Sequence, residues 1–179
     1  MSITQTLIAD SIAQAMLAEF ETQAPITRRF LERLPEDKLT WKPHEKSMTA
    51  GQLAIHIAST QGGVVRFVQT NPAQAPDFPR FPQPGGCQEI LHVFDEGVGV
   101  VREILPTIGD AEMAETWRLI AGGKEVIAQP RAQFLRDVMF SHVYQHRGQL
   151  SVYLRLLNLS VPASWGPSAD EPPLFMQRA

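Results

Sequence analysis

Two histidines on one predicted helix face are the residues of this sequence best suited to chemistry. His142 and His146 lie four residues apart in the segment 141–150. Residues at this spacing on a helix have Cβ atoms about 5–6 Å apart on one face. Two imidazole nitrogens can then reach one metal ion at about 2.0–2.1 Å each. The pair alone fits equally well an ordinary polar histidine beside a chance neighbour, so a third ligand is needed to favour a metal site.

A third histidine lies on the apolar face of another predicted helix. His56 shares its stripe with Leu53 and Ile57, so its side chain is expected to point inward. A buried imidazole loses solvation unless a partner satisfies it. If the two helices are neighbours, His56 meets His142 and His146, and a divalent cation is a common partner for three ring nitrogens. Three neutral ligands leave positions open to water or substrate, which is typical of a catalytic rather than a structural site.

The other histidines and the cysteine are interpreted as structural. A carboxylate di-iron site needs two Glu-x-x-His motifs. This sequence has one, Glu89 to His92, so both residues are expected at the surface. His44 follows Pro43 in a polar connection, where a structural capping role is expected. Nothing near Cys87 in the sequence would lower the pKa of its thiol, so Cys87 is expected to be inert.

No carboxylate can be assigned as a general base from the sequence. Glu19 and Glu21 are candidates, but solvated surface positions explain them equally well. The sequence lacks a Gly-x-Ser-x-Gly nucleophile elbow, a Gly-x-x-x-x-Gly-Lys-Ser/Thr loop and a Gly-x-Gly-x-x-Gly motif. Gly122-Gly123-Lys124 is too short to cradle a phosphate. The functional hypothesis therefore rests on the histidines.

Apolar spacing predicts four helices that position these residues. Pro25 is expected to kink or interrupt the first helix. Thr49 and Gln52 fit a capping box at the start of the second. The expected helices are Ile3–Leu34, a helix that follows Thr49 and extends to Phe67, Gln88–Leu105, and Pro130–Asn158.

The connections between these helices are unusual. Five prolines between Asn71 and Gly86 rule out helix and predict a long structureless link, so the second and third helices need not be antiparallel neighbours. Two β-prone runs that flank a Gly-Gly pair within Trp117–Ala128 predict a small hairpin. The proline-rich tail, Ser160–Ala179, is expected to pack as an ordered strap. The predicted fold is all-α, a four-helix bundle with a small β-hairpin before the last helix.

Composition excludes several classes of protein. The chain has 179 residues, 44% of them hydrophobic, so one domain over residues 1–179 can bury a core without crosslinks. One cysteine excludes an internal disulfide and a cysteine-based zinc site. The sequence has no secretion signal and no apolar run near the roughly 18 residues that span a bilayer, so a cytoplasmic protein without a membrane partner is expected. A net charge of −3 without a Lys/Arg cluster gives no basis for nucleic-acid binding.

Four segments of the chain resemble the DinB-like (DinB/YfiT) superfamily. His142–Leu150 and Pro162–Asp170 are similar to the last helix and tail of that family, and Trp41–Ser47 and Gly51–Ala58 to its second-helix motif. The resemblance extends over essentially the whole chain. It implies a four-helix bundle with up-down-down-up connectivity and a divalent metal ion, Zn²⁺ or Ni²⁺, held by His56, His142 and His146.

The resemblance also implies a class of reaction. Characterised members of the family include bacillithiol S-transferases, a mycothiol-dependent maleylpyruvate isomerase and the metal-binding domain of an ergothioneine-pathway enzyme. We therefore expect a metal-dependent enzyme, a thiol-dependent S-transferase that acts on a small molecule. Gln145 and Trp165 replace a histidine and a tyrosine common in the family, which leaves the ligands in place but weakens the inference about the substrate.

Three alternatives stay open at this point. Water as the nucleophile would make the protein a metal-dependent hydrolase. A non-catalytic metal-binding stress protein would use the ion to join two helices. The three histidines could also be satisfied by hydrogen bonds without a metal. Family members often form homodimers, and a homodimer is expected here because irregular segments expose the aromatic residues Phe78, Phe81, Trp165 and Phe175.

Overall fold

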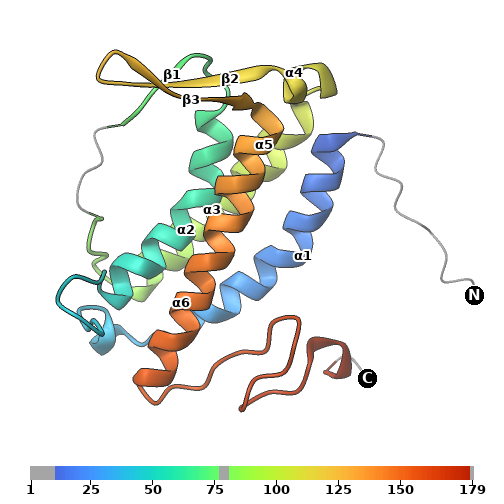
Figure 1. Ribbon diagram of the computed structural model, residues 1–179. Helices are drawn as coiled ribbons and strands as arrows, with labels where there is room; N and C mark the ends of the chain where they lie inside the picture. Colours follow the sequence, from blue (N-terminus) through green and yellow to red (C-terminus); the bar gives the residue numbers. More distant parts are fainter. Residues whose placement is uncertain (1–10, 77–80, 178–179) are drawn as a thin grey trace, which may run out of the picture.

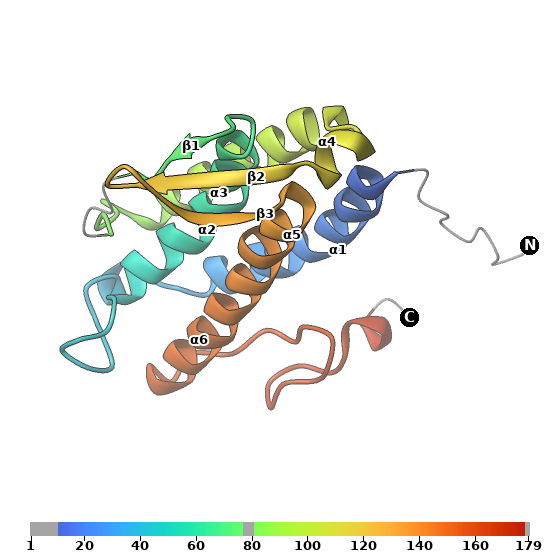
Figure 2. The same cartoon turned by 45° about the horizontal axis from the view of Figure 1, so that its top comes forward.

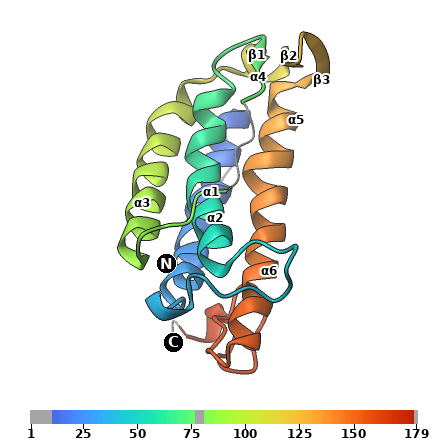
Figure 3. The same ribbon diagram turned by 90° about the vertical axis from the view of Figure 1, so that its left-hand side faces the viewer.

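The computed structural model describes residues 11–76 and 81–177, which form a mostly helical fold with a small three-stranded sheet at one end (Figure 1). The longer helices lie side by side along the molecule (Figure 3). They are α1 (Ile12–Glu32), α2 (Ala50–Phe67), α3 (Cys87–Ile104) and α6 (Val143–Leu156). Shorter helices are α4 (Asp110–Ala114) and α5 (Arg131–Leu135), with 3₁₀ turns at Glu36–Lys38, Leu105–Thr107 and Leu174–Met176.

The predicted helices are present, with changes at their ends and at one proline. The prediction that the first helix begins at Ile3 concerns residues that lie outside the described part. Helix α1 continues through Pro25, so the helix is not interrupted there, and the kink expected as the other possible effect of Pro25 stays a prediction. A proline removes one backbone hydrogen bond, and the burial of Phe20 and Phe30 on the same helix offsets that loss.

The helix predicted over Pro130–Asn158 is not uniform. Residues Arg136–His142 are π-helical and join α5 to α6 in one continuous helical run. A π-helical turn closes hydrogen bonds from residue i to i+5 and is rare outside functional or strained positions. The π segment ends at His142, one of the candidate metal ligands.

The hairpin predicted around Gly122 is confirmed and belongs to a larger sheet. Strands β2 (Thr116–Ala121) and β3 (Lys124–Pro130) are antiparallel. Gly122 and Gly123 form the turn with φ values of 56° and 75°, which glycine adopts without strain. The link expected to be structureless contributes a third strand, β1 (Ala73–Gln74), which pairs in parallel with β2 (Figure 2). The link is therefore not structureless: Ala73 is buried, and its burial places this part of the link against the edge of the hairpin.

Trp117 joins the sheet to the helices. Its indole ring is fully buried, 4.2 Å from the ring of Phe134 in α5 and 5.5 Å from that of Phe67 in α2. Its Nε1–H donates a 2.8 Å hydrogen bond to the carbonyl oxygen of Thr70. Arg131, also buried, donates to the carbonyl oxygen of Val68 at the end of α2. These contacts fix the ends of α2 and α5 relative to each other.

Helices α2 and α3 pack at unusually close range. A Cβ built on Gly62 would lie 2.6 Å from Cα of Gly97 and 3.0 Å from its carbonyl oxygen. Glycine at both positions lets the two backbones approach, as in other close helix pairs. One face of α2 is thereby fixed against α3. The confirmed capping box, in which Thr49 and Gln52 bond each other's backbone N–H, fixes its first turn.

The tail is ordered mainly by polar contacts. Glu171 pairs with Arg29 of α1 and with Arg33, the residue that follows α1, and Asp170 pairs with Arg155 of α6. The side chains of Trp165 and Phe175 are 64% and 75% exposed, so the strap is anchored by ion pairs more than by its aromatic residues. The expected strap is therefore present up to residue 177, and residues 178–179 lie outside the described part.

The prediction of a helical chain with a hairpin before the last helical run is thus confirmed, with β1 as an addition. The up-down-down-up four-helix bundle stays a prediction at this stage. No helix in the described ranges is both long and apolar enough to cross a membrane.

We expect Gly62→Ala to destabilise the protein by about 1–3 kcal/mol, because the added methyl group meets the backbone of Gly97 and forces α2 away from α3. Urea unfolding followed by circular dichroism measures this change. Gly63→Ala is the matched control: Gly63 is exposed in the same helix and a Cβ there meets nothing within 4 Å. The control variant should gain up to about 1 kcal/mol from helix propensity. Equal stability of the two variants would contradict the close-packing argument.

Candidate metal centre

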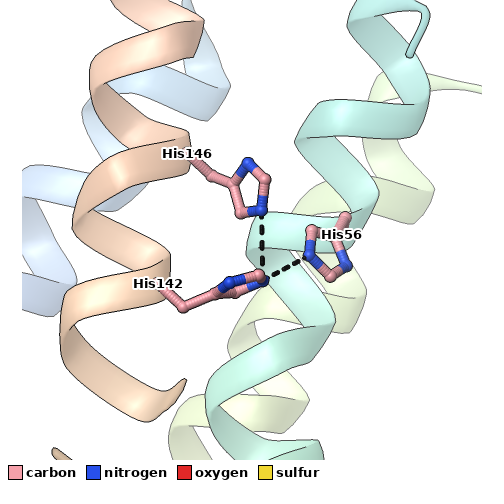
Figure 4. A group of neighbouring side chains, drawn as sticks. All are labelled: His56, His142 and His146. Atoms are coloured by element: carbon pink, nitrogen blue, oxygen red, sulfur yellow. Dashed lines mark hydrogen bonds between the residues drawn. The ribbon is translucent and has the colours of Figure 1, made fainter. Parts of the chain in front are cut away.

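Three imidazole rings converge between α2 and the helical run that contains α6 (Figure 4). The Nε2 atom of His142 lies 2.9 Å from Nε2 of His56 and 3.1 Å from Nε2 of His146. One ring nitrogen from each histidine lies within 4.8 Å of the others. His146 is buried and His56 and His142 are half-buried. The expected meeting of these residues in space is therefore confirmed.

Hydrogen bonding alone cannot satisfy this arrangement. Each ring nitrogen has a single site in the ring plane, which holds either a proton or a lone pair. Nε2 of His142 can therefore form one full hydrogen bond, yet it has two close nitrogen neighbours. Ligands bound tetrahedrally at 2.0–2.1 Å are about 3.3 Å apart, close to these separations. The donor set and its spacing fit one small divalent cation.

A glutamine fixes which nitrogen of His146 faces the cluster. The Nδ1 atom of His146 lies 2.7 Å from Oε1 of Gln149, one turn further along α6. An amide oxygen can only accept, so Nδ1 carries the proton and Nε2 presents its lone pair. This is the outer contact typical of metal-binding histidines. Gln149 was not predicted as part of the site, although its position three residues after His146 places both side chains on one helix face.

His56 is held by contacts on two sides. Its carbonyl oxygen accepts a hydrogen bond from Oγ1 of Thr60. On the solvent side, the ring of Phe81 lies 4.7 Å from the imidazole, edge to face. The side chain of Gln52 donates to the carbonyl oxygen of Phe81 at 2.9 Å and holds the link in this position. The partly exposed ring of Phe81 thus lies at the edge of the histidine cluster, beside His56.

Burial favours the uncharged form of two of the three imidazoles, His56 and His142. Desolvation, followed by repulsion from His146 and His142, lowers the pKa of His56 to about 4. Desolvation, and then His146, lowers the pKa of His142 as well. Both rings are therefore neutral near pH 7, the form in which a ring nitrogen can bind a metal ion.

Residues 19–150 match the model of a family described as the DinB superfamily. The chain belongs to the DinB superfamily. A curated relative, the uncharacterized protein YrdA of Bacillus subtilis, is 26% identical over 157 residues, which cover 87% of this chain and 89% of YrdA.

Two solved DinB-like structures have a similar fold. A DinB-like protein from Bacillus cereus is 18% identical, with a TM-score of 0.68 over 84% of this chain and 96% of its own. The DinB-like protein YjoA of Bacillus subtilis is 19% identical, with a TM-score of 0.62 over 83% and 96% of the two chains. At such identities the comparison concerns the fold alone.

The other candidate residues of this DinB chain lie outside the cluster and have structural partners. Glu89 accepts a hydrogen bond from the backbone N–H of Gly85, and His92 is exposed beside Glu96, 3.5 Å away. His44 accepts from the backbone N–H of Lys46 through Nδ1, a structural contact within a turn, while the described helix that follows is capped by Thr49. These positions agree with the predicted surface locations of Glu89 and His92.

Cys87 and the two candidate carboxylates are also in structural positions. The Cys87 thiol donates to the carbonyl oxygen of Leu34, and burial and then Glu36 raise its pKa, which agrees with an inert thiol. Glu19 binds Arg136 and the hydroxyl of Tyr144, and Glu21 binds Arg102. Neither carboxylate belongs to the histidine cluster in this DinB chain.

Metal-free protein should lose stability as the pH falls from about 6.5 to about 4. The pKa of His56 is lower in the folded chain than its ordinary value of 6.5, so the unfolded chain binds the proton first and acid favours unfolding. Urea midpoints measured with a chelator between pH 7.5 and 4.5 give the dependence. In His56→Asn the dependence should be weaker, whereas the exposed-site control His92→Asn should follow the wild type. Parallel curves for all three proteins would refute the assignment.

Gln149→Leu should weaken metal binding by about 10–100-fold, because Nδ1 of His146 loses the acceptor that fixes its tautomer. Competition between the protein and a chromophoric zinc chelator measures the affinity. Gln145→Leu, an exposed change on the same helix, is the control and should bind like the wild type. Equal affinities in the two variants would mean that Gln149 plays no part in the site.

Proposed function

We propose that this DinB chain is a metal-dependent enzyme in which His56, His142 and His146 hold one divalent ion, Zn²⁺ or Ni²⁺. The observation that supports the proposal is the convergence of three Nε2 atoms that hydrogen bonds cannot all satisfy. Within the described residues, the cluster contains three potential ligands and no fourth. Such a donor set leaves coordination positions for water or substrate, as in catalytic zinc sites.

The side chains around the cluster prepare it for an organic nucleophile. A bound divalent ion would supply Lewis acidity and lower the pKa of a thiol or water ligand. An imidazole binds a metal ion in its uncharged form, so three such ligands would leave the ion its full positive charge, which favours an anionic nucleophile. Gln149 orients His146, and the ring of Phe81 gives an apolar border against which a small molecule can pack.

We propose a low-molecular-weight thiol as this nucleophile, which makes the protein an S-transferase. The thiol sulfur would form a bond to an electrophilic carbon of the second substrate. The leaving group would depart with its electron pair, and the thiol proton would pass to solvent. The support is the softness of a thiolate toward Zn²⁺ and Ni²⁺, together with the resemblance of His142–Leu150 to the family that contains thiol transferases.

Two other functions are distinguished from this one by simple measurements. A hydrolase would use water in the same open position and would turn over esters or amides without a thiol. A non-catalytic stress protein would use the ion to join α2 and α6, with a gain in stability and no turnover. The absence of a fourth ligand among the described residues favours the catalytic alternatives.

The proposal also covers the domain organisation, the cellular location and the oligomeric state of the protein. We propose one domain over residues 1–179, built as an up-down-down-up four-helix bundle, that works in the cytoplasm as a homodimer. Phe81, Trp165 and Phe175 are 42%, 64% and 75% exposed and offer apolar surface for a second copy. Phe78, the fourth aromatic residue expected at this surface, lies outside the described part of the chain. No nucleic acid or membrane is expected as a partner.

Untagged protein should bind one equivalent of Zn²⁺ or Ni²⁺, and His142→Ala should lower the affinity by at least 100-fold, because His142 contacts both other ligands. Isothermal titration and metal analysis measure the binding. His44→Ala and His92→Ala remove histidines outside the cluster and should bind like the wild type. Undiminished binding by His142→Ala would contradict the metal site.

The loaded protein would then be assayed with thiols plus an alkylating electrophile and, separately, with esters. Conjugation that requires both the thiol and His142 supports the transferase. Ester hydrolysis without a thiol would replace it with the hydrolase. One equivalent of metal with no turnover of either panel would favour the non-catalytic protein.

A further inference from the structure

A cavity of about 300 Å³ lies between α1, α6 and the C-terminal tail. Its walls come from Phe30 of α1, from the middle of α6 and from the tail at Val161–Ser168. The tail runs past the ends of α6 and α1 that lie away from the sheet (Figures 1 and 2). The size is at the lower end of the range for small-molecule sites. None of the three histidines lines this cavity.

Arg147 supplies a buried positive charge to the cavity wall. Arg147 is only 8% exposed. The guanidinium has five N–H donors, of which Nη1 donates to Oγ1 of Thr27 at 3.2 Å. The ring of Tyr144 covers the guanidinium at 5.0 Å. Within the part of the chain that the structure describes, Nε and Nη2 make no hydrogen bond, so this edge is free for a ligand.

No described carboxylate pairs with Arg147, and three carboxylates of α1 and the tail are engaged elsewhere. Glu19 binds Arg136 and Tyr144. Glu171 pairs with two arginines at the end of α1, Arg29 and Arg33, and Asp170 pairs with Arg155. A buried cation without a counterion is costly. An anion that enters the cavity would offset this cost.

The free edge and the walls define the chemistry of that anion. Nε and Nη2 of a guanidinium form a planar fork that matches the two oxygens of a carboxylate. Phe30, Val161 and Pro162 provide apolar surface beside the fork. We propose that this cavity binds a small organic carboxylate, with the carboxylate on Arg147 and its apolar body against these residues.

The cavity is a separate site from the histidine cluster. Arg147 directly follows His146, so the two side chains leave α6 about 100° apart. His146 reaches His142 and the α2 side, whereas Arg147 reaches Thr27 of α1. One helix thus presents a metal-type site on one side and an anion-type site on another.

Benzoate is the probe, titrated calorimetrically into full-length protein at constant ionic strength, both metal-loaded and chelator-treated. Saturable binding with one equivalent is expected in both forms. Arg147→Met should lower the affinity about tenfold or more, because it removes a charged hydrogen-bond donor. Arg66→Met, an exposed arginine on α2, is the matched control and should bind like the wild type.

Gly148→Leu tests the cavity without removing the arginine. Gly148 lines the cavity, and a Cβ there meets nothing within 4 Å, so a leucine can fill the space while helix propensity improves. This variant should fold and lose benzoate binding, even if Arg147→Met does not fold. Inorganic phosphate and benzyl alcohol should bind at least tenfold more weakly than benzoate.

Four results would overturn the proposal. They are no saturable benzoate binding, unchanged binding in Gly148→Leu, binding that requires the metal, and phosphate binding as strong as benzoate. The third would place the carboxylate on the histidine-bound ion instead. The fourth would identify a general anion site. Because the chelator-treated protein is part of the experiment, failure of the metal-enzyme proposal leaves this one testable.

Discussion

The structure depends on holding three imidazole nitrogens closer together than their own hydrogen bonds can satisfy. His142 has close nitrogen neighbours on both sides, and burial disfavours the protonated forms that would otherwise relieve the contact. Such a cluster persists only if the helices that carry it cannot move apart. The close packing of α2 on α3 at Gly62 and Gly97 provides one part of that restraint. The contacts of Trp117 and Arg131 at the sheet end provide another.

The histidine cluster was predictable because its signals are local in sequence. A spacing of four residues brings His142 and His146 to one helix face, and the apolar stripe around His56 points that residue inward. The capping box at Thr49 and the hairpin turn at Gly122 are equally local, since each depends on residues within one turn of the chain. The only non-local assumption was that α2 and α6 are neighbours, and the distances between the rings confirm it.

Features set by distant contacts were missed. Strand β1 forms because Ala73 meets the hairpin at Leu119, which the prolines around it do not indicate. The continuation of α1 through Pro25 depends on the packing of that helix against the core. The cavity beside Arg147 exists only because the tail returns to α1 through ion pairs that span more than a hundred residues. Pattern and propensity cannot rank such contacts before the fold is known.

The π-helical stretch before α6 changes the directions in which side chains leave the helical run from α5 to α6. Because each π turn contains about one residue more than an α turn, side chains beyond Arg136–His142 emerge at an azimuth that an unbroken α-helix would not give them. Phe134 can then face Trp117 at one end while His146 faces α2 at the other. Deletion of one residue within this stretch would make the whole run α-helical and would rotate the side chains at one end relative to those at the other. The extra residue thus lets the end of the run that contacts the sheet and the end that carries His146 each face its own neighbours.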